Sequence, residues 1–264
     1  MEQLCRAIGM PEEVTQILLT MEPRPLPTEP LLRRETWDQG LQELRRAIGD
    51  DPRGFRMLHT QLGCALAARQ VYHRLGLSER IYIDTMAAFS RFVKEHLVSF
   101  GCYGFDRDFW TVRQIACVQF RIGELEYCLT REQGEKVVYL HIPSDADLSL
   151  PRLRASYLEA RATLRRVFPD YADVPIISES WLFSPALAQF LPEDSRILDF
   201  QRSFTIRPCR DGREDVLLWV FKHPGMALEA LPVDTRLQRA LKPFLRSGGV
   251  FPVGQAVLKA DPFL

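Results

Sequence analysis

The sequence predicts an α+β fold in which a helical N-terminal domain packs on a mixed β-sheet with a central βαβ unit. Two observations support this prediction. Apolar side chains recur three and four positions apart through the first hundred residues, whereas strand-like runs begin only after residue 104. Two apolar runs, 136–142 and 175–183, flank a helical segment at 151–168, and strands joined by such a crossover lie parallel in one sheet.

The helical N-terminal domain is expected to span residues 1–104. Its helices are predicted at residues 12–19, 35–48, 55–75 and 79–98. Four prolines between residues 21 and 30 forbid a continuous helix there and favour an extended linker. Asp51 and Ser78 are candidate caps for the third and fourth helices. The junction at 101–104 is too short for a flexible tether, so we expect the two domains to form one rigid unit.

The C-terminal domain, residues 105–264, is expected to hold the sheet. Its strands are predicted at residues 110–122, 124–130, 137–142, 175–183, 204–207 and 216–221. Gly123 and residues 131–134 supply the turns of a meander, and the Asp211-Gly212 dipeptide predicts a hairpin between the last two runs.

Three helices are expected in this second half, at residues 151–168, 185–190 and 231–245. Ser149 is a candidate cap for the first of them, Pro151 fits its first turn, and Pro169 ends it. Residues 247–254 close the chain as a loop with room for one more strand.

Composition excludes several classes of function. The 34 basic and 34 acidic residues cancel, so no overall field attracts nucleic acid or an anionic membrane. The longest apolar run, 216–221, is too short to span a membrane. The N-terminus lacks the basic end and apolar stretch of a secretory signal. Six scattered cysteines and five dispersed histidines form no zinc motif, so we expect free thiols, no metal and a cytoplasmic protein. No feature indicates an oligomeric state.

A polar loop, residues 144–149, lies where the first parallel strand ends and the crossover helix begins, the usual ligand site of an α/β sheet. His141, at the strand end, is the candidate general base, with an ordinary pKa near ~6.5. The alternative is a hydrogen-bonded histidine inside the sheet. Asp145 either orients His141, binds a cationic acceptor or caps the helix. A calcium loop is rejected because Leu150 and Ser156 stand where it needs glycine and glutamate.

Five separate short segments of the chain resemble the sequences of a bacterial family of predicted acyltransferases. Members of this family join a helical N-terminal acyltransferase region to a GNAT-like C-terminal domain. The five segments are residues 110–114 (WTVRQ), 120–126 (FRIGELE), 140–145 (LHIPSD), 180–185 (SWLFSP) and 237–242 (LQRALK). The resemblance covers nearly the whole chain. It implies a GNAT-like mixed sheet whose fourth and fifth strands splay apart, with acyl-CoA as co-substrate and its thioester arm in the gap.

The resemblance also implies a set of site residues. The carbonyl would be polarised by backbone N–H groups near His141 and Ile142. The pyrophosphate would meet the start of the crossover helix. The 3′-phosphate would meet Arg154, Arg161 and Arg165, which share one helical face, unless that face is simply solvated. Trp181 would line the thioester channel or fill the core. The residues expected to contact the thioester are Ile142, Ser144, Asp147, Leu148, Ser149, Arg154 and Trp181.

Two departures from the usual GNAT pattern concern the loop and the proton donor. The loop lacks the glycines that normally let backbone N–H groups approach a pyrophosphate, and it carries Asp145 and Asp147, which would repel phosphates. No tyrosine follows Tyr171, so Ser184, Cys209 or water would protonate the departing thiolate. The expected catalytic set is His141, Asp145 and Ser184.

Three functions follow from these observations. The first is direct acyl transfer from acyl-CoA, or from an acyl carrier protein, to an amine or hydroxyl. The second is a catalytically silent GNAT-like module that binds an acyl thioester or another small ligand. The third is a protein-interaction platform on the helical domain, which a large exposed apolar patch would support.

Overall fold

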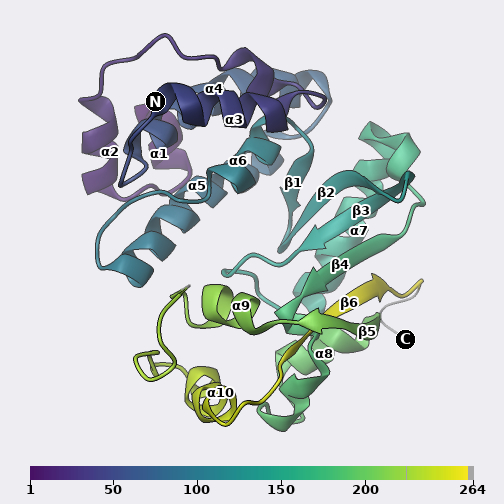
Figure 1. Cartoon of the computed structure of the whole chain (residues 1–264). Coiled ribbons are helices and arrows are strands. Elements are labelled where there is room, and N and C mark those ends of the chain that lie inside the picture. Colours follow the sequence, from purple (N-terminus) through teal and green to yellow (C-terminus); the bar gives the residue numbers. More distant parts are fainter. Residues whose placement is uncertain (224, 261–264) are drawn as a thin grey trace.

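A mixed six-stranded sheet lies between two groups of helices (Figure 1). The computed structural model describes residues 1–223 and 225–260. The N-terminal helices gather beside the first strand, and the last helices lie beside the opposite edge of the sheet (Figure 1). The predicted α+β class, with its helical N-terminal half, is confirmed.

The N-terminal half consists of α1 (Glu2–Ala7), α2 (Glu12–Leu19), α3 (Trp37–Ile48), α4 (Phe55–Arg74), α5 (Glu79–Phe100) and α6 (Asp108–Ile115). Four of these helices were predicted to within two residues at each end. A short 3-10 turn, Glu29–Leu32, follows the proline-rich linker. The Ser78 hydroxyl accepts from the Ile81 N–H at 3.2 Å, which confirms that cap. Asp51 accepts from the Met57 N–H at 2.9 Å, although Gly54 occupies the cap position of α4.

The sheet runs in the order β1-β2-β3-β4-β6-β5. Its strands are β1 (Gln119–Ile122), β2 (Leu125–Glu132), β3 (Glu135–His141), β4 (Ile176–Ser180), β5 (Phe204–Asp211) and β6 (Pro252–Leu258). Strands β3 and β4 are parallel and are joined by α7 (Leu150–Val167), while the other neighbours are antiparallel. The predicted βαβ unit is therefore confirmed.

The segment predicted as a strand at 110–122 is wrong over most of its length, because residues 108–115 form α6 and β1 begins only at Gln119. Its β-branched residues suit either structure, and packing decides between them. Gln61 of α4 donates to the Asp108 carbonyl at 3.1 Å, and the Tyr72 hydroxyl donates to the Gln114 carbonyl at 2.8 Å. Both bonds fix α6 on the helical half.

The hairpin predicted at Asp211-Gly212 is also wrong. Residues 216–220 form a π-helical turn in which the Phe221 N–H donates to the Val216 carbonyl at 3.0 Å, so both side chains reach one buried cluster. The partner of β5 is β6, which inserts between β4 and β5. Gly212 donates to the Phe251 carbonyl at 2.8 Å, and a Cβ there would lie 2.8 Å from that oxygen.

Short elements complete the C-terminal half. They are the 3-10 turns Pro169–Tyr171, Trp181–Phe183 (η3) and Pro185–Gln189, the helices α8 (Arg196–Arg202) and α9 (Arg213–Asp215), the π turn Val216–Val220 (η5) and α10 (Arg236–Arg246). Helix α10 begins five residues later than predicted, because Thr235 and Gln238 form a capping box.

One hydrophobic core joins the helical half to the sheet, as the rigid-unit prediction requires. The Tyr72 ring of α4 meets Phe120 of β1 edge-on at 5.5 Å, and Phe120 stacks on Phe168 at 5.3 Å. A second, smaller cluster forms under α10 and η5. The division of the chain at residue 104 stays a prediction.

Candidate active site

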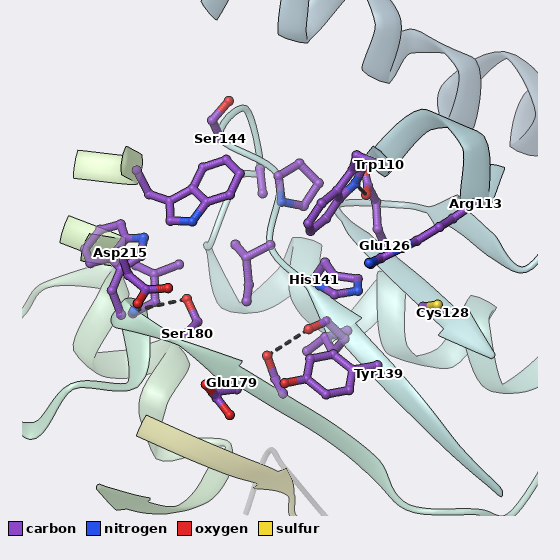
Figure 2. A pocket seen from close by; sticks show the side chains of 18 of the residues that line it. Trp110, Arg113, Glu126, Cys128, Tyr139, His141, Ser144, Glu179, Ser180 and Asp215 are labelled. Atoms are coloured by element: carbon purple, nitrogen blue, oxygen red, sulfur yellow. Dashed lines mark hydrogen bonds between the residues drawn. The ribbon is translucent and has the colours of Figure 1, made fainter. Parts of the chain in front are cut away.

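A cavity of about 880 Å³ lies between α5, α6 and the ends of strands β2 to β4. Figure 2 shows Trp110, Glu126, His141 and Tyr139 on one wall and Ser180 with Asp215 on the opposite side. The cavity therefore draws on the helical half, on the sheet and on the segment around η5. Its size is that of a small-molecule site.

The cavity opens where β3 and β4 separate. The two strands pair only at Val138 with Ile176 and at Tyr139 with Ile177. Beyond these pairs the Leu140 carbonyl accepts the Ser178 hydroxyl at 2.7 Å instead of a backbone N–H. The splay implied by the resemblance is thus present, although the strands that separate are the third and fourth of this chain, and Leu140, His141 and Ile142 line the cavity there.

A buried ion pair stabilises the wall of the cavity. Glu126 of β2 is 1% exposed and Arg91 of α5 is 9% exposed, and they meet at 2.6 Å. The Glu126 carboxylate also accepts from the Trp110 indole at 2.9 Å and from Gln119 at 2.6 Å. Burial alone would raise the pKa of Glu126, but the Arg91 charge and these donors outweigh it and lower the pKa. Glu126 is therefore a fixed anion that orients Trp110.

His141 lies beside this anion, since it pairs with Glu126 across β2 and β3. Its ring meets Trp110 edge-on at 4.6 Å and stacks on Tyr139 at 5.1 Å. Burial lowers the pKa of His141 to about 4, and the neighbouring Glu126 only partly opposes that shift. The unperturbed pKa expected from the sequence is therefore wrong, because aromatic rings replace water around the imidazole. At neutral pH the ring is uncharged and able to accept a proton.

The far side of the cavity carries a second charge cluster. Arg210 of β5 donates to Glu179 of β4 at 2.7 Å and to Asp215 of α9 at 2.6 Å. Lys222, just after η5, lies 3.5 Å from Glu95 of α5, and Glu95 also accepts the Ser144 hydroxyl. These bonds connect the C-terminal segment, the helical half and the loop after β3 at the border of the cavity.

The loop after β3 splits the predicted thioester contacts into two groups. Ile142, Ser144 and Leu148 line the cavity, as does Trp181. Asp147 and Ser149 do not line it, and the Ser149 N–H donates to the Asp147 carboxylate at 2.9 Å. Asp147 therefore occupies one donor that a phosphate at the start of α7 would use, and Arg196 balances its charge at 3.1 Å.

Asp145 binds arginine, and no hydrogen bond joins it to His141 within the described residues. Both of its oxygens accept from Arg121, at 2.7 and 2.9 Å, and Arg91 lies 3.5 Å away. These cations offset the repulsion of phosphate that the sequence suggested. The orienting and capping roles considered for Asp145 stay predictions.

Ser184 and Arg154 lie outside the residues that line the cavity. Ser184 is fully buried between η3 and the following 3-10 turn, and its hydroxyl has no hydrogen-bond partner in the described chain. Arg154 is exposed on α7. Their assigned roles stay predictions that the cavity geometry does not support.

Arg91 was missed by the sequence reasoning, whereas the resemblance implied that Glu126, with Arg113, Gln114 and Arg121, lies on strands that border the acceptor side. The available signal was a charged residue in a largely apolar stretch, since Arg91 follows Ala87-Ala88-Phe89-Ser90 and precedes Phe92-Val93. A charge on the buried face of a helix needs an opposite charge from elsewhere in the fold. Spacing alone did not identify that partner, which lies 35 residues away.

Metal ligands and membrane spans are absent from residues 1–223 and 225–260. No group of three or more His, Cys, Asp or Glu side chains gathers there in a way that could hold a metal ion. No helix in the same residues is long and apolar enough to cross a membrane.

Two family models match adjoining parts of the chain. One, described as a GNAT-like C-terminal domain, matches residues 118–258, and the other, an N-acyltransferase N-terminal domain, matches residues 1–117. A comparison with curated proteins found no match.

Solved structures share the fold. An acyltransferase in complex with decanoyl-CoA has a TM-score of 0.80 at 24% identity, over 97% of this chain and 86% of that one. An acyltransferase in complex with decanoyl-CoA and teicoplanin has a TM-score of 0.81 at 23% identity, over 98% and 87%. An acyltransferase in complex with CoA and 10C-teicoplanin has a TM-score of 0.74 at 22% identity, over 98% and 99%.

Proposed function

This chain belongs to the family of the GNAT-like C-terminal domain, and we propose from that premise that it transfers an acyl group from acyl-CoA to an amine or hydroxyl acceptor. One observation carries the proposal: the cavity meets the sheet where β3 and β4 splay, and His141 stands at that point. The binding of decanoyl-CoA and CoA by acyltransferases of the same fold supports it.

The donor is proposed to enter along the gap between β3 and β4, with its acyl chain against Leu148, Trp181 and Leu182 in the cavity. Backbone N–H groups at the end of β3 would polarise the thioester carbonyl. The pyrophosphate would meet the start of α7, where it would replace Asp147 at the Ser149 N–H and find Arg196. Arg196 thus offers a cation in place of the missing glycines.

Direct transfer is proposed to proceed in one balanced exchange. The acceptor nitrogen or oxygen attacks the carbonyl carbon, a C–N or C–O bond forms, and the C–S bond breaks. The acceptor proton moves to neutral His141, and Glu126 stabilises the charge that the ring gains. The lowered pKa makes the imidazolium a better proton donor to the departing thiolate and the neutral ring a weaker base. A separate tyrosine or serine is then unnecessary.

The test combines binding with thiol release. The protein is incubated with decanoyl-CoA and a panel of amines and alcohols, and free CoA is measured alongside calorimetric affinity for the thioester. His141→Gln is expected to lower turnover by roughly two to three orders of magnitude, while the affinity for decanoyl-CoA stays nearly constant. The matched control is His73→Gln, because His73 pairs with Glu79 on the surface of α4, outside the cavity.

Three results contradict this proposal in different ways. Tight binding of decanoyl-CoA without thiol release identifies a silent thioester-binding module. Failure to bind any acyl-CoA removes the donor from the proposal. Equal turnover by the His141 variant and the control places the base elsewhere.

A further inference from the structure

The charged side chains that line the cavity do not all pair with one another. Three of the cations that line it pair with carboxylates: Arg91 with Glu126, Arg210 with Glu179 and Asp215, and Lys222 with Glu95. Two further lining arginines, Arg34 and Arg113, have no carboxylate partner in the described part of the chain. A cation in a partly dry cavity is costly unless something neutralises it.

Arg113 is the more telling of the two. It follows Trp110 by one helical turn on α6, so both side chains leave the same face of the helix. Its guanidinium lies 5.5 Å from the Trp110 ring centre and 5.8 Å from that of Trp37, and these ring contacts are its only partners among residues 1–223 and 225–260. Figure 2 shows it reaching towards His141. Its five donors are therefore available to a ligand beside the proposed base.

Arg34 approaches the same region from the segment before α3. One N–H of its guanidinium donates to the Cys117 carbonyl at 2.5 Å, and the guanidinium carbon lies 4.8 Å from the Phe168 ring centre. Both arginines line the cavity together with Cys128, and burial raises the pKa of the Cys128 thiol to about 11 although both charges act to lower it. The thiol stays neutral at physiological pH and cannot serve as their counter-ion.

We infer that the acceptor is an amine or alcohol that carries a carboxylate, and that Arg113, assisted by Arg34, binds this carboxylate and so selects the acceptor. The inference rests on the proposed function and names its substrate class. A planar guanidinium matches a carboxylate with two parallel hydrogen bonds, and the flanking tryptophans fix its orientation. With the carboxylate on Arg113, the amine or hydroxyl of a compact acceptor faces His141.

The bound carboxylate would also favour proton transfer. Arg113 is one of the groups that lower the pKa of His141, so neutralising its charge makes the ring a stronger base. The exchange is that of the proposed function: the acceptor heteroatom bonds to the acyl carbon, the C–S bond breaks, and the acceptor proton passes through His141 to the thiolate. The carboxylate takes no part in bond making.

The test compares matched acceptors that differ only in charge. Amino acids and their carboxamides, and lactate and lactamide, are presented with decanoyl-CoA to the full chain. Arg113→Gln is expected to lower kcat/KM for the carboxylates by roughly ten- to hundredfold and for the amides by less than about twofold. Arg113→Glu is expected to reverse the preference towards diamines. Arg46→Gln, on the exposed face of α3, is the control.

A second readout does not require turnover. N-decanoyl amino acids, which resemble the products, are expected to bind wild-type protein at least about tenfold more tightly than N-decanoyl carboxamides, and Arg113→Gln should abolish that ratio. Equal affinity for the two, or an equal loss for both acceptor types in the variant, overturns the inference. A raised KM for decanoyl-CoA alone would show that Arg113 binds a CoA phosphate, which also overturns it. Acyl-CoA binding and turnover with neutral acceptors would leave the proposed function standing.

Discussion

Replacing Arg91 with methionine is expected to destabilise the fold by about 3–5 kcal/mol, the usual cost of leaving one partner of a buried ion pair uncompensated. Glu126 is 1% exposed and would keep only the Trp110 and Gln119 donors. With a urea m-value of roughly 3 kcal/mol per M, the unfolding midpoint should fall by about 1 M or more. Urea titration followed by circular dichroism measures this shift.

The loss of folding stability in Arg91→Met should also depend on pH in a defined direction. The pKa of Glu126 is lowered in the wild type, so the stability that the pair contributes is present above the usual value of 4.5 and is lost as the pH falls through the folded pKa. Without Arg91, burial raises that pKa, so the destabilisation of Arg91→Met should be larger at pH 8 than at pH 5. The control is Arg202→Met, which removes an exposed pair with Asp199 and should cost below about 1 kcal/mol.

Two outcomes would refute the reasoning about this pair. A cost for Arg91→Met no larger than that of Arg202→Met would mean that the pair is solvated. A destabilisation that does not grow with pH would mean that Glu126 does not carry the charge. In the double variant with Glu126→Gln, the loss should be smaller than the sum of the two single losses, because no charge is then left buried.

Three further predictions concern the loop, the base and the linker. Asp147→Asn should leave the affinity for CoA unchanged or raise it in calorimetry, because an amide is a weaker acceptor than a carboxylate and competes less with phosphate for the Ser149 N–H. A clear loss of affinity would show that Asp147 has a binding role. The His141 ring should titrate near pH 4 by NMR. Because this folded pKa lies below the usual 6.5, about 3 kcal/mol of folding stability is present above pH 6.5 and is lost as the pH falls to 4. A midpoint near 6.5 would instead show a solvated ring. Limited proteolysis should cut residues 23–30 before 101–104, and early release of an intact C-terminal fragment would contradict the rigid unit.

The helices of the N-terminal half were predictable because residues next to each helix end determine where the helix begins and stops. Helix α5 begins after Ser78, which caps it, and ends at Gly101, which adopts a left-handed conformation. The same holds for the βαβ unit, since Pro151 and Pro169 bracket α7. In such segments periodicity, caps and breakers agree, so no distant contact is needed to choose the structure.

The errors arose where distant contacts decide. Residues 110–115 are β-branched and apolar enough for a strand, but hydrogen bonds from Gln61 and to the Gln114 carbonyl place them on the helical bundle. Residues 216–220 look like a strand beside Gly212, yet β6 takes the place of the expected partner. The propensity of five or six residues carries no information about a partner segment that lies far away in the sequence.

The same limit applies to the site. His141, Ile142, Ser144, Leu148 and Trp181 were predicted from the strand end and the resemblance, and all five line the cavity. The environment that changes their chemistry was not predictable, because it comes from α5 and α6. The low pKa of His141 depends on Trp110 and Tyr139 covering its ring, and Trp110 faces that ring only after α6 has formed.

The site therefore depends on both halves of the chain in different ways. The β3–α7 loop, which belongs to the sheet, supplies the proposed contacts to the pyrophosphate. The proposed reacting end uses Arg91, Trp110 and Arg113 from the helices, because Arg91 keeps Glu126 charged and Arg113 has no carboxylate partner among the described residues. Since donor contacts and acceptor contacts come from different halves, substitutions in α6 can alter acceptor choice without changing thioester affinity. The helical half is thus the part of this fold in which we expect acceptor specificity to be set.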